Sequence, residues 1–234
     1  MKHIAICFAA IFGIAQLASA AQVCAAGTLA TYEALGAGGC TIGTNTVFDF
    51  NTPSGISGAT PIALGNINIT PSGGTTSPTL TFTTSATASD GMLLEALIDY
   101  SISGNQYGSD SITLAGTASA GNGAVTDIQN YCLGGSFDST GVSNCSSGNT
   151  GDLLLLGDGN SSVSFARASL LNVTDDFTLD SGGAGAGNTA RGGTITDTFT
   201  TVPEPATYLF IAAGLFLAML PKTINKIFVR EKEK

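Results

Sequence analysis

Residues 79–84, TLTFTT, show the pattern that decides the fold, because apolar and threonine side chains alternate along them. In an extended chain successive side chains point to opposite faces, so Leu80 and Phe82 share one face and the threonines share the other. This alternation is typical of a strand with one buried and one exposed face. The stretch therefore predicts a β-strand at the surface of an apolar core.

Similar short segments lie on both sides of this stretch and are separated by turns rich in Gly, Ser, Asn and Pro. We expect strands at residues 46–51, 62–70, 79–84, 92–103, 111–117, 124–131, 152–156, 162–166, 173–180 and 193–200. None of these segments shows a convincing helical period, and the glycine-rich residues 182–193 read as a flexible loop. The sequence therefore predicts an all-β domain over residues 21–201, a β-sandwich of jelly-roll-like form.

The first 20 residues have the features of a secretory signal peptide. Lys2 precedes an apolar core at residues 4–17, and the small residues Ala18 and Ala20 mark the cleavage site. A first transmembrane helix is the less favoured interpretation, because the apolar run is short and ends in small residues. We therefore expect the chain to be exported.

The last 33 residues, 202–234, form a second targeting segment. An uncharged run at residues 208–220 spans about 20 Å as a helix, so a helix crossing the roughly 30 Å hydrocarbon core must continue beyond it. Five Lys and Arg residues follow the run and place the tail on the cytoplasmic side. The segment predicts a single C-terminal transmembrane helix with residues 21–201 outside.

The order Val202-Pro203-Glu204-Pro205, apolar run and basic tail resembles the PEP-CTERM sorting signal of Gram-negative bacteria. The resemblance implies recognition and cleavage by a membrane-embedded exosortase-type enzyme. It also implies an inner-membrane-anchored precursor, then a place in the cell envelope, at the cell surface or in the extracellular matrix. It further implies a role linked to exopolysaccharide and biofilm. An ordinary C-terminal membrane anchor is the alternative.

Four cysteines remain after Cys7 leaves with the signal peptide: Cys24, Cys40, Cys132 and Cys145. An even count in an exported chain predicts disulfides, and three pairings are possible. We expect the local pairs, Cys24 with Cys40 and Cys132 with Cys145, because each closes a short loop. Zinc is the alternative, but the spacing lacks a Cys-x-x-Cys motif.

Charge and composition exclude several classes of function for residues 21–201. Fourteen acidic residues less Arg167 and Arg191 give −12, a charge that repels nucleic acid. The same residues contain no His, Lys or Trp, which excludes Ser-His-Asp and Cys-His catalysis and lysine Schiff bases. We expect no cofactor and no catalysis.

Paired carboxylates keep one enzymatic alternative open, a divergent polysaccharide hydrolase or lyase. Glu95 and Asp99 share a face of a predicted strand, but about 13 Å separates residues four apart in a strand, which is too far for either glycosidase mechanism. Glu33 is the other glutamate before the sorting signal. We expect Glu95 and Asp99 to be solvated strand residues.

Two binding hypotheses rest on small clusters. Asp158 and Asn160 offer oxygen ligands at alternate positions and are calcium candidates, although the sequence lacks the remaining acids of an EF-hand loop. A turn capped by its own side chains is the favoured interpretation. A calcium-dependent carbohydrate-binding or adhesion module therefore remains an alternative to a structural surface role. Four tyrosines are the aromatic candidates for a sugar platform: Tyr32, Tyr100, Tyr107 and Tyr131.

Overall fold

The computed structural model describes residues 22–53, 58–185, 187–202 and 211. The signal peptide at residues 1–20, and the sorting signal apart from Val202 and Ile211, lie outside the described residues. No helix among the residues described is both long and apolar enough to span a membrane.

Fourteen strands and one short α-helix make up the described chain, with 3₁₀ turns at Gly36–Gly38 and Leu64–Asn66. The elements are β1 (Gly27–Thr28), α1 (Leu29–Glu33), β2 (Cys40–Ile42), β3 (Asn45–Asn51), β4 (Thr60–Pro61), β5 (Ile67–Gly73), β6 (Pro78–Thr84), β7 (Thr87–Ser89), β8 (Leu93–Ala115), β9 (Ala118–Ala120), β10 (Ala124–Leu133), β11 (Thr150–Leu156), β12 (Gly159–Asp180), β13 (Thr189–Arg191) and β14 (Thr194–Thr201). The prediction of an all-β sandwich is confirmed, and its likeness to a jelly roll stays a prediction.

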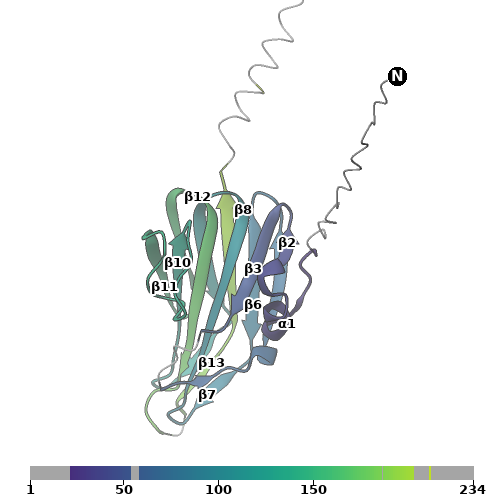
Figure 1. Ribbon diagram of the computed structural model, residues 1–234. Coiled ribbons are helices and arrows are strands. Elements are labelled where there is room, and N and C mark those ends of the chain that lie inside the picture. Colours follow the sequence, from purple (N-terminus) through teal and green to yellow (C-terminus); the bar gives the residue numbers. More distant parts are fainter. Residues whose placement is uncertain (1–21, 54–57, 186, 203–210, 212–234) are drawn as a thin grey trace, which may run out of the picture.

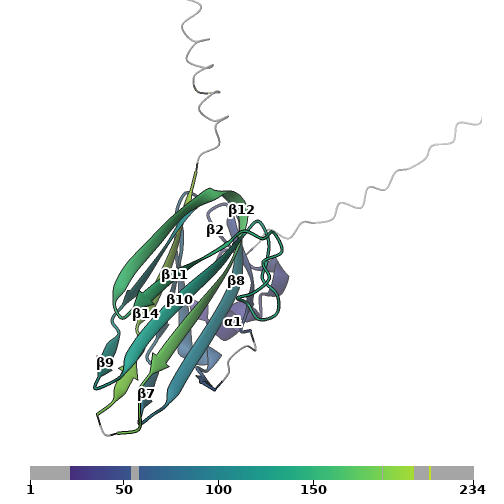
Figure 2. The same ribbon diagram turned by 90° about the vertical axis from the view of Figure 1, so that its left-hand side faces the viewer.

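Two long strands, β8 and β12, join the two layers of the sandwich (Figures 1 and 2). Residues 93–103 of β8 pair with the second half of β12 and with β3, whereas residues 109–115 pair with the first half of β12 and with β14. The first layer contains β2, β3, β10 and β11 besides these strands, and the second contains β1, β5, β6 and β14. Each long strand therefore contributes to both layers.

The interior between the layers is filled by the apolar side chains that period-two alternation places on the inner faces of the strands. Leu80 and Phe82 of β6 are 1% and 2% exposed, and the outward threonines of β6 pair with those of β14 through hydroxyl hydrogen bonds of 3.2–3.4 Å. Tyr100 of the first layer meets Phe82 and Phe199 of the second at ring-centroid distances of 5.8 and 6.3 Å. An aromatic cluster thus holds the layers together.

The expectation of ten separate short strands is wrong in three places. Segment 62–70 includes the 3₁₀ turn Leu64–Asn66, so its strand, β5, begins only at Ile67. Segments 92–103 and 111–117 fall within or overlap β8, and segments 162–166 and 173–180 both lie within β12. The strands bend rather than break, with register shifts between Ser164 and Leu170 and with Gly104 at φ +138°. A side chain at Gly104 would contact the carbonyl of Thr44 at 2.8 Å, so this bend requires glycine.

Two further elements correct the sequence analysis. The helix α1, whose N-terminus is capped by Thr28, buries Leu29 and Tyr32 beside β3. Its five residues are too few to show a helical period. The glycine-rich residues 182–193 contain the strand β13, which pairs with β7 and β9 in a small second sheet. That sheet lies at the end of the sandwich opposite the last residues of β14 (Figure 1).

Both local disulfides are confirmed. Cys24 bonds to Cys40 and ties the chain before α1 to β2, whereas Cys132 bonds to Cys145 and closes the loop after β10. Free thiols and zinc thiolates are therefore excluded for these cysteines. Two disulfides in one chain indicate an oxidising compartment, extracellular or periplasmic.

Candidate binding site beside the β10–β11 loop

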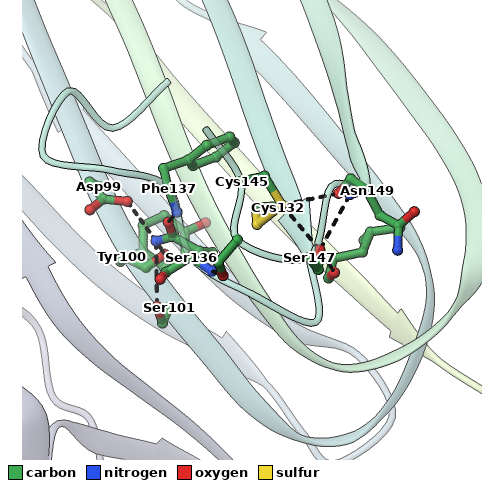
Figure 3. Close-up of a disulfide and its surroundings, with 12 residues drawn as sticks. Asp99, Tyr100, Ser101, Cys132, Ser136, Phe137, Cys145, Ser147 and Asn149 are labelled. Atoms are coloured by element: carbon green, nitrogen blue, oxygen red, sulfur yellow. Dashed lines mark hydrogen bonds between the residues drawn. A yellow bond between two sulfur atoms is a disulfide. The ribbon is translucent and has the colours of Figure 1, made fainter. Parts of the chain in front are cut away.

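The loop between β10 and β11, residues 134–149, is held in place at several points. Apart from the disulfide, Gly134 donates its N–H to the Leu170 carbonyl at 2.7 Å, and Phe137 donates to the Asn172 side chain at 2.8 Å. Within the loop, Asp138 accepts hydrogen bonds from Thr140 and, at 2.6 Å, from Asn144, and these polar contacts lower the pKa of its carboxyl. Figure 3 shows this disulfide and the surrounding side chains.

The aromatic pocket, a cavity of about 750 Å³, lies on one side of this loop. Its lining combines aromatic, amide and cationic side chains: Tyr131, Phe165, Gln106, Asn149 and Arg167. The volume falls within the roughly 300–1,000 Å³ typical of ligand pockets. It therefore has both the size and the mixed polarity of a small-molecule or glycan site.

The geometry of the aromatic pair follows from the register of three strands. The rings of Tyr131 and Phe165 lie 5.6 Å apart at an angle of 37°. Tyr131 pairs across the ladder with Gly151, where an added side chain would meet the tyrosine hydroxyl at 2.0 Å. Gly151 therefore leaves room for the tyrosine ring over β11.

Phe165 and Arg167 lie at the bend of β12, where the pairing with β8 is interrupted between Ser164 and Ala168. Such irregularities redirect side chains away from the regular alternation and are common beside functional sites. Phe165 is half-buried against Tyr131, and Arg167 is exposed at the rim. Neither Phe165 nor Arg167 was a site candidate from the sequence, because no local pattern marks a bulge that depends on pairing with another strand.

A second, polar pocket of about 410 Å³ lies on the other side of the same loop. Asp99 lines it and accepts hydrogen bonds from Asn172 at 2.6 Å and Thr174 at 3.2 Å. Burial outweighs these contacts and raises the pKa of Asp99 to about 6. Asp49, at φ +54°, lines this pocket too.

The acidic residues considered for catalysis have other partners. Burial, followed by the neighbouring Asp176, raises the pKa of Glu95 to about 7, so Glu95 shares its surroundings with Asp176 rather than with Asp99. Glu33 accepts a hydrogen bond from Thr52 at 2.8 Å. The three acids of the enzymatic alternative therefore each have a different contact. The expectation that Glu95 and Asp99 are solvated is wrong, because both are partly buried and burial is the largest cause of their raised pKa values.

The surroundings of each tyrosine and of each calcium candidate show which of them could take part in binding. Tyr32, Tyr100 and Tyr107 are 0–2% exposed and serve the core, and Tyr131, which is 7% exposed, packs in the core and also lines the aromatic pocket. Asp158 accepts hydrogen bonds from the backbone N–H groups of residues 116 and 117 at 3.0 and 2.9 Å, as a turn cap does. Asn160 is exposed in β12. Among the residues that the structure describes, no group of three or more acids, cysteines or histidines is placed to hold a metal.

Comparison with known proteins gives little. No family model and no curated protein matches the chain. Among solved structures, a match is found to TmCBM61 in complex with beta-1,4-galactotriose, at 12% sequence identity. It covers 54% of this chain and 71% of that one, with a TM-score of 0.25. At this level the likeness carries no argument about a ligand.

Proposed function

We propose that this chain is a non-enzymatic surface protein that binds polysaccharide through the aromatic pocket. The observation that carries the proposal is the Tyr131–Phe165 pair, flanked by the guanidinium of Arg167 in a cavity closed on one side by the disulfide loop. The half-buried ring of Phe165, backed by the buried ring of Tyr131, offers apolar surface to the C–H face of a sugar ring. The amides of Gln106 and Asn149 offer both donors and acceptors for hydroxyl groups.

The charge distribution favours a neutral polysaccharide over a polyanion. Residues 21–201 have a formal charge of −12, and Arg167 is the cation at the pocket. A polyuronate would meet this negative field at the pocket, where Arg167 is the one lining cation that opposes it. A neutral chain avoids that repulsion and still uses the donors of Arg167.

The sorting signal completes the proposal. Val202, the first residue of the motif, donates its N–H to the carbonyl of Gln106 at 2.7 Å, and Gln106 lines the aromatic pocket. The chain therefore leaves the sandwich beside the pocket and continues into Pro203-Glu204-Pro205. We propose that an exosortase-type enzyme processes the chain there and delivers it to the cell surface or matrix, where exopolysaccharide is the ligand.

Affinity electrophoresis of the purified full-length chain tests the binding proposal. The gels contain a neutral glucan, a neutral galactan or the polyuronate alginate. Retardation by a neutral polysaccharide, lost in Phe165→Ala, is expected. If no polysaccharide of the panel, nor exopolysaccharide from the source bacterium, retards the chain, the proposal is wrong.

The hydrolase or lyase alternative has one structural basis, the raised pKa of Asp99 in the polar pocket. Asn172 and Thr174 hydrogen-bond to this carboxyl and can account for its position. Release of reducing ends from a polysaccharide by the wild type, abolished in Asp99→Asn, would favour that alternative. We expect no release by either protein.

A further inference from the structure

The interior of the sandwich contains a group of aspartates, which we call the core acid cluster: Asp110 of β8, Asp127 of β10, Asp175 of β12 and Asp197 of β14. Their side chains are 0–1% exposed. Gln129 of β10, also 0% exposed, belongs to the same group. None of these residues lines the aromatic or the polar pocket, and the proposed function makes no use of the cluster.

Register places these side chains on the inner faces of both layers. In the first layer Asp127 pairs with Phe177, which makes Asp175 its diagonal neighbour. In the second layer Asp110 pairs with Phe199, which makes Asp197 its diagonal neighbour. Asp175 and Asp197 approach each other across the interior closely enough for one carboxyl to donate a hydrogen bond to the other. Four acids thus converge from two layers.

No basic side chain compensates the cluster in the described part of the chain. Residues 21–201 contain no Lys or His, and Arg167 and Arg191 are both exposed. Tyr100 donates its hydroxyl to Asp197 at 2.6 Å. With the carboxyls ionised, all side-chain oxygens of Asp110, Asp127 and Asp175 and one of Asp197 lack a hydrogen-bond donor, and Gln129 lies beside Asp197 and acts to lower its pKa.

Ionised carboxylates without partners in a dry core cost several kcal/mol each, so a cation or a proton must neutralise them. The described residues form no group with the geometry to hold a metal. A carboxylate only accepts hydrogen bonds, whereas a protonated carboxyl also donates one. Protonation therefore removes the charge and supplies the donors that the unpartnered oxygens lack.

We infer that the core acid cluster is a buried proton-binding site that keeps protons in the folded protein at neutral pH, on Asp110, Asp127 and Asp175. The sandwich then gains stability from acid and loses it as the pH rises, in contrast to proteins whose carboxylates are paired. The inference concerns the core and stands or falls separately from polysaccharide binding.

The directions of the pKa shifts of the four aspartates agree with this inference. Burial, reinforced by the other acids of the cluster, raises the pKa of Asp110, Asp127 and Asp175 well above the usual range, and burial raises that of Asp197 to about 6. The other titratable groups acting on the cluster are Tyr100, Tyr131 and Asp176, none of which can carry a positive charge.

The sign of the pH dependence follows from proton counting. An aspartate in the unfolded chain has a pKa of about 3.9. Above that pH the unfolded chain has released its protons while the folded core keeps them, so stability falls with rising pH. Each proton kept lowers the folding equilibrium constant about tenfold per pH unit. The contribution is fully present below about pH 4, and that of Asp197 is lost as the pH passes about 6.

Urea unfolding of the full-length chain in a non-ionic detergent, followed by near-ultraviolet circular dichroism of the buried tyrosines, tests the inference. Between pH 6 and 8 the equilibrium constant is expected to fall at least about tenfold per pH unit. Asp127→Asn and Asp175→Asn, which mimic the protonated acid, are expected to flatten the slope and to stabilise the protein at pH 8. Asp152→Asn, at an exposed position of β11, is the control and is expected to leave the slope unchanged.

A second measurement covers variants that fail to fold. The infrared carbonyl band of a protonated carboxylic acid is expected in the folded wild type at pH 7 and weakens when Asp127→Asn is introduced. Stability that is flat or rising from pH 6 to 8, or absence of the band, overturns the inference. Loss of stability on adding EDTA, restored by calcium, also overturns it, because a metal would then neutralise the cluster.

Discussion

Tyr100 of β8 donates a 2.6 Å hydrogen bond to Asp197 of β14 across the interior of the sandwich. The tyrosine belongs to the first layer and the aspartate to the second, so one polar contact joins the layers inside an aromatic cluster. It also supplies a donor to the core acid cluster. Loss of the tyrosine hydroxyl would change the packing little but would leave an oxygen of Asp197 without its donor.

Tyr100→Phe is therefore expected to destabilise the protein by about 1–3 kcal/mol, the usual cost of a buried polar group that loses its partner. Tyr107→Phe is the matched control, because Tyr107 also donates to a buried side chain, Asn45, at 2.8 Å. The Asn45 oxygen keeps a donor from Asn105 at 3.2 Å, so a smaller loss is expected. Urea unfolding at pH 6 compares the two. Equal losses would show that Asp197 does not depend on this contact.

Removing each disulfide in turn distinguishes an effect on stability from an effect on binding. Replacing either pair by serine is expected to cost about 3 kcal/mol, since the loops are of similar length. Only loss of Cys132–Cys145 is expected to weaken polysaccharide binding, because that bond closes the wall of the aromatic pocket, whereas Cys24–Cys40 lies beside α1. Binding measured below the unfolding transition distinguishes them. Equal loss of binding in both variants would mean that the loop has no specific role.

Glu95 is expected to titrate near pH 7, because burial and then Asp176 raise its pKa. Asp176→Asn removes the neighbouring charge and is expected to lower the midpoint of Glu95, as followed by carbon NMR of the carboxyl groups. Asp180→Asn, an exposed substitution at the end of the same strand, is the control. A Glu95 midpoint that does not move in Asp176→Asn would show that burial alone sets it.

The sorting proposal is tested by replacing Pro203-Glu204-Pro205 with three alanines. The apolar run and the basic tail stay intact, so membrane insertion is expected to persist while processing stops. Mass spectrometry of the chain from an exosortase-containing host reports both ends. Unchanged cleavage in the variant would reduce residues 202–234 to an ordinary anchor.

Alternation and cysteine count were sufficient for much of the fold. The threonine and apolar faces of β6 lie as their spacing predicts, and the local disulfides follow from loop length. The sequence pattern did not predict that β8 and β12 bend rather than end, because Gly104 and the serines around it are typical of a turn. Whether such a segment turns or bends depends on the neighbouring strands, which local sequence does not specify.

The core acid cluster had a sequence signal of its own. Val173, Phe177 and Leu179 share a face, and period-two alternation places Asp175 between them on that face. Asp127 has the same relation to Val125 and Tyr131. By contrast, Phe165 and Arg167 meet Tyr131 only through the interrupted register of β12, so the aromatic pocket required the three-dimensional structure.

The most direct test of the proposed function compares the two arginines of residues 21–201. Both are exposed, but Arg167 lines the aromatic pocket and Arg191 lies in β13 of the small sheet. Arg167→Gln and Arg191→Gln change the net charge equally, so a general electrostatic effect is the same in both. Isothermal titration of each variant with the neutral polysaccharide that retards the wild type is the measurement. We predict that Arg167→Gln weakens binding at least about tenfold, as loss of a charged hydrogen bond does, and that Arg191→Gln binds like the wild type. Equal affinities for the two variants would contradict binding at this pocket.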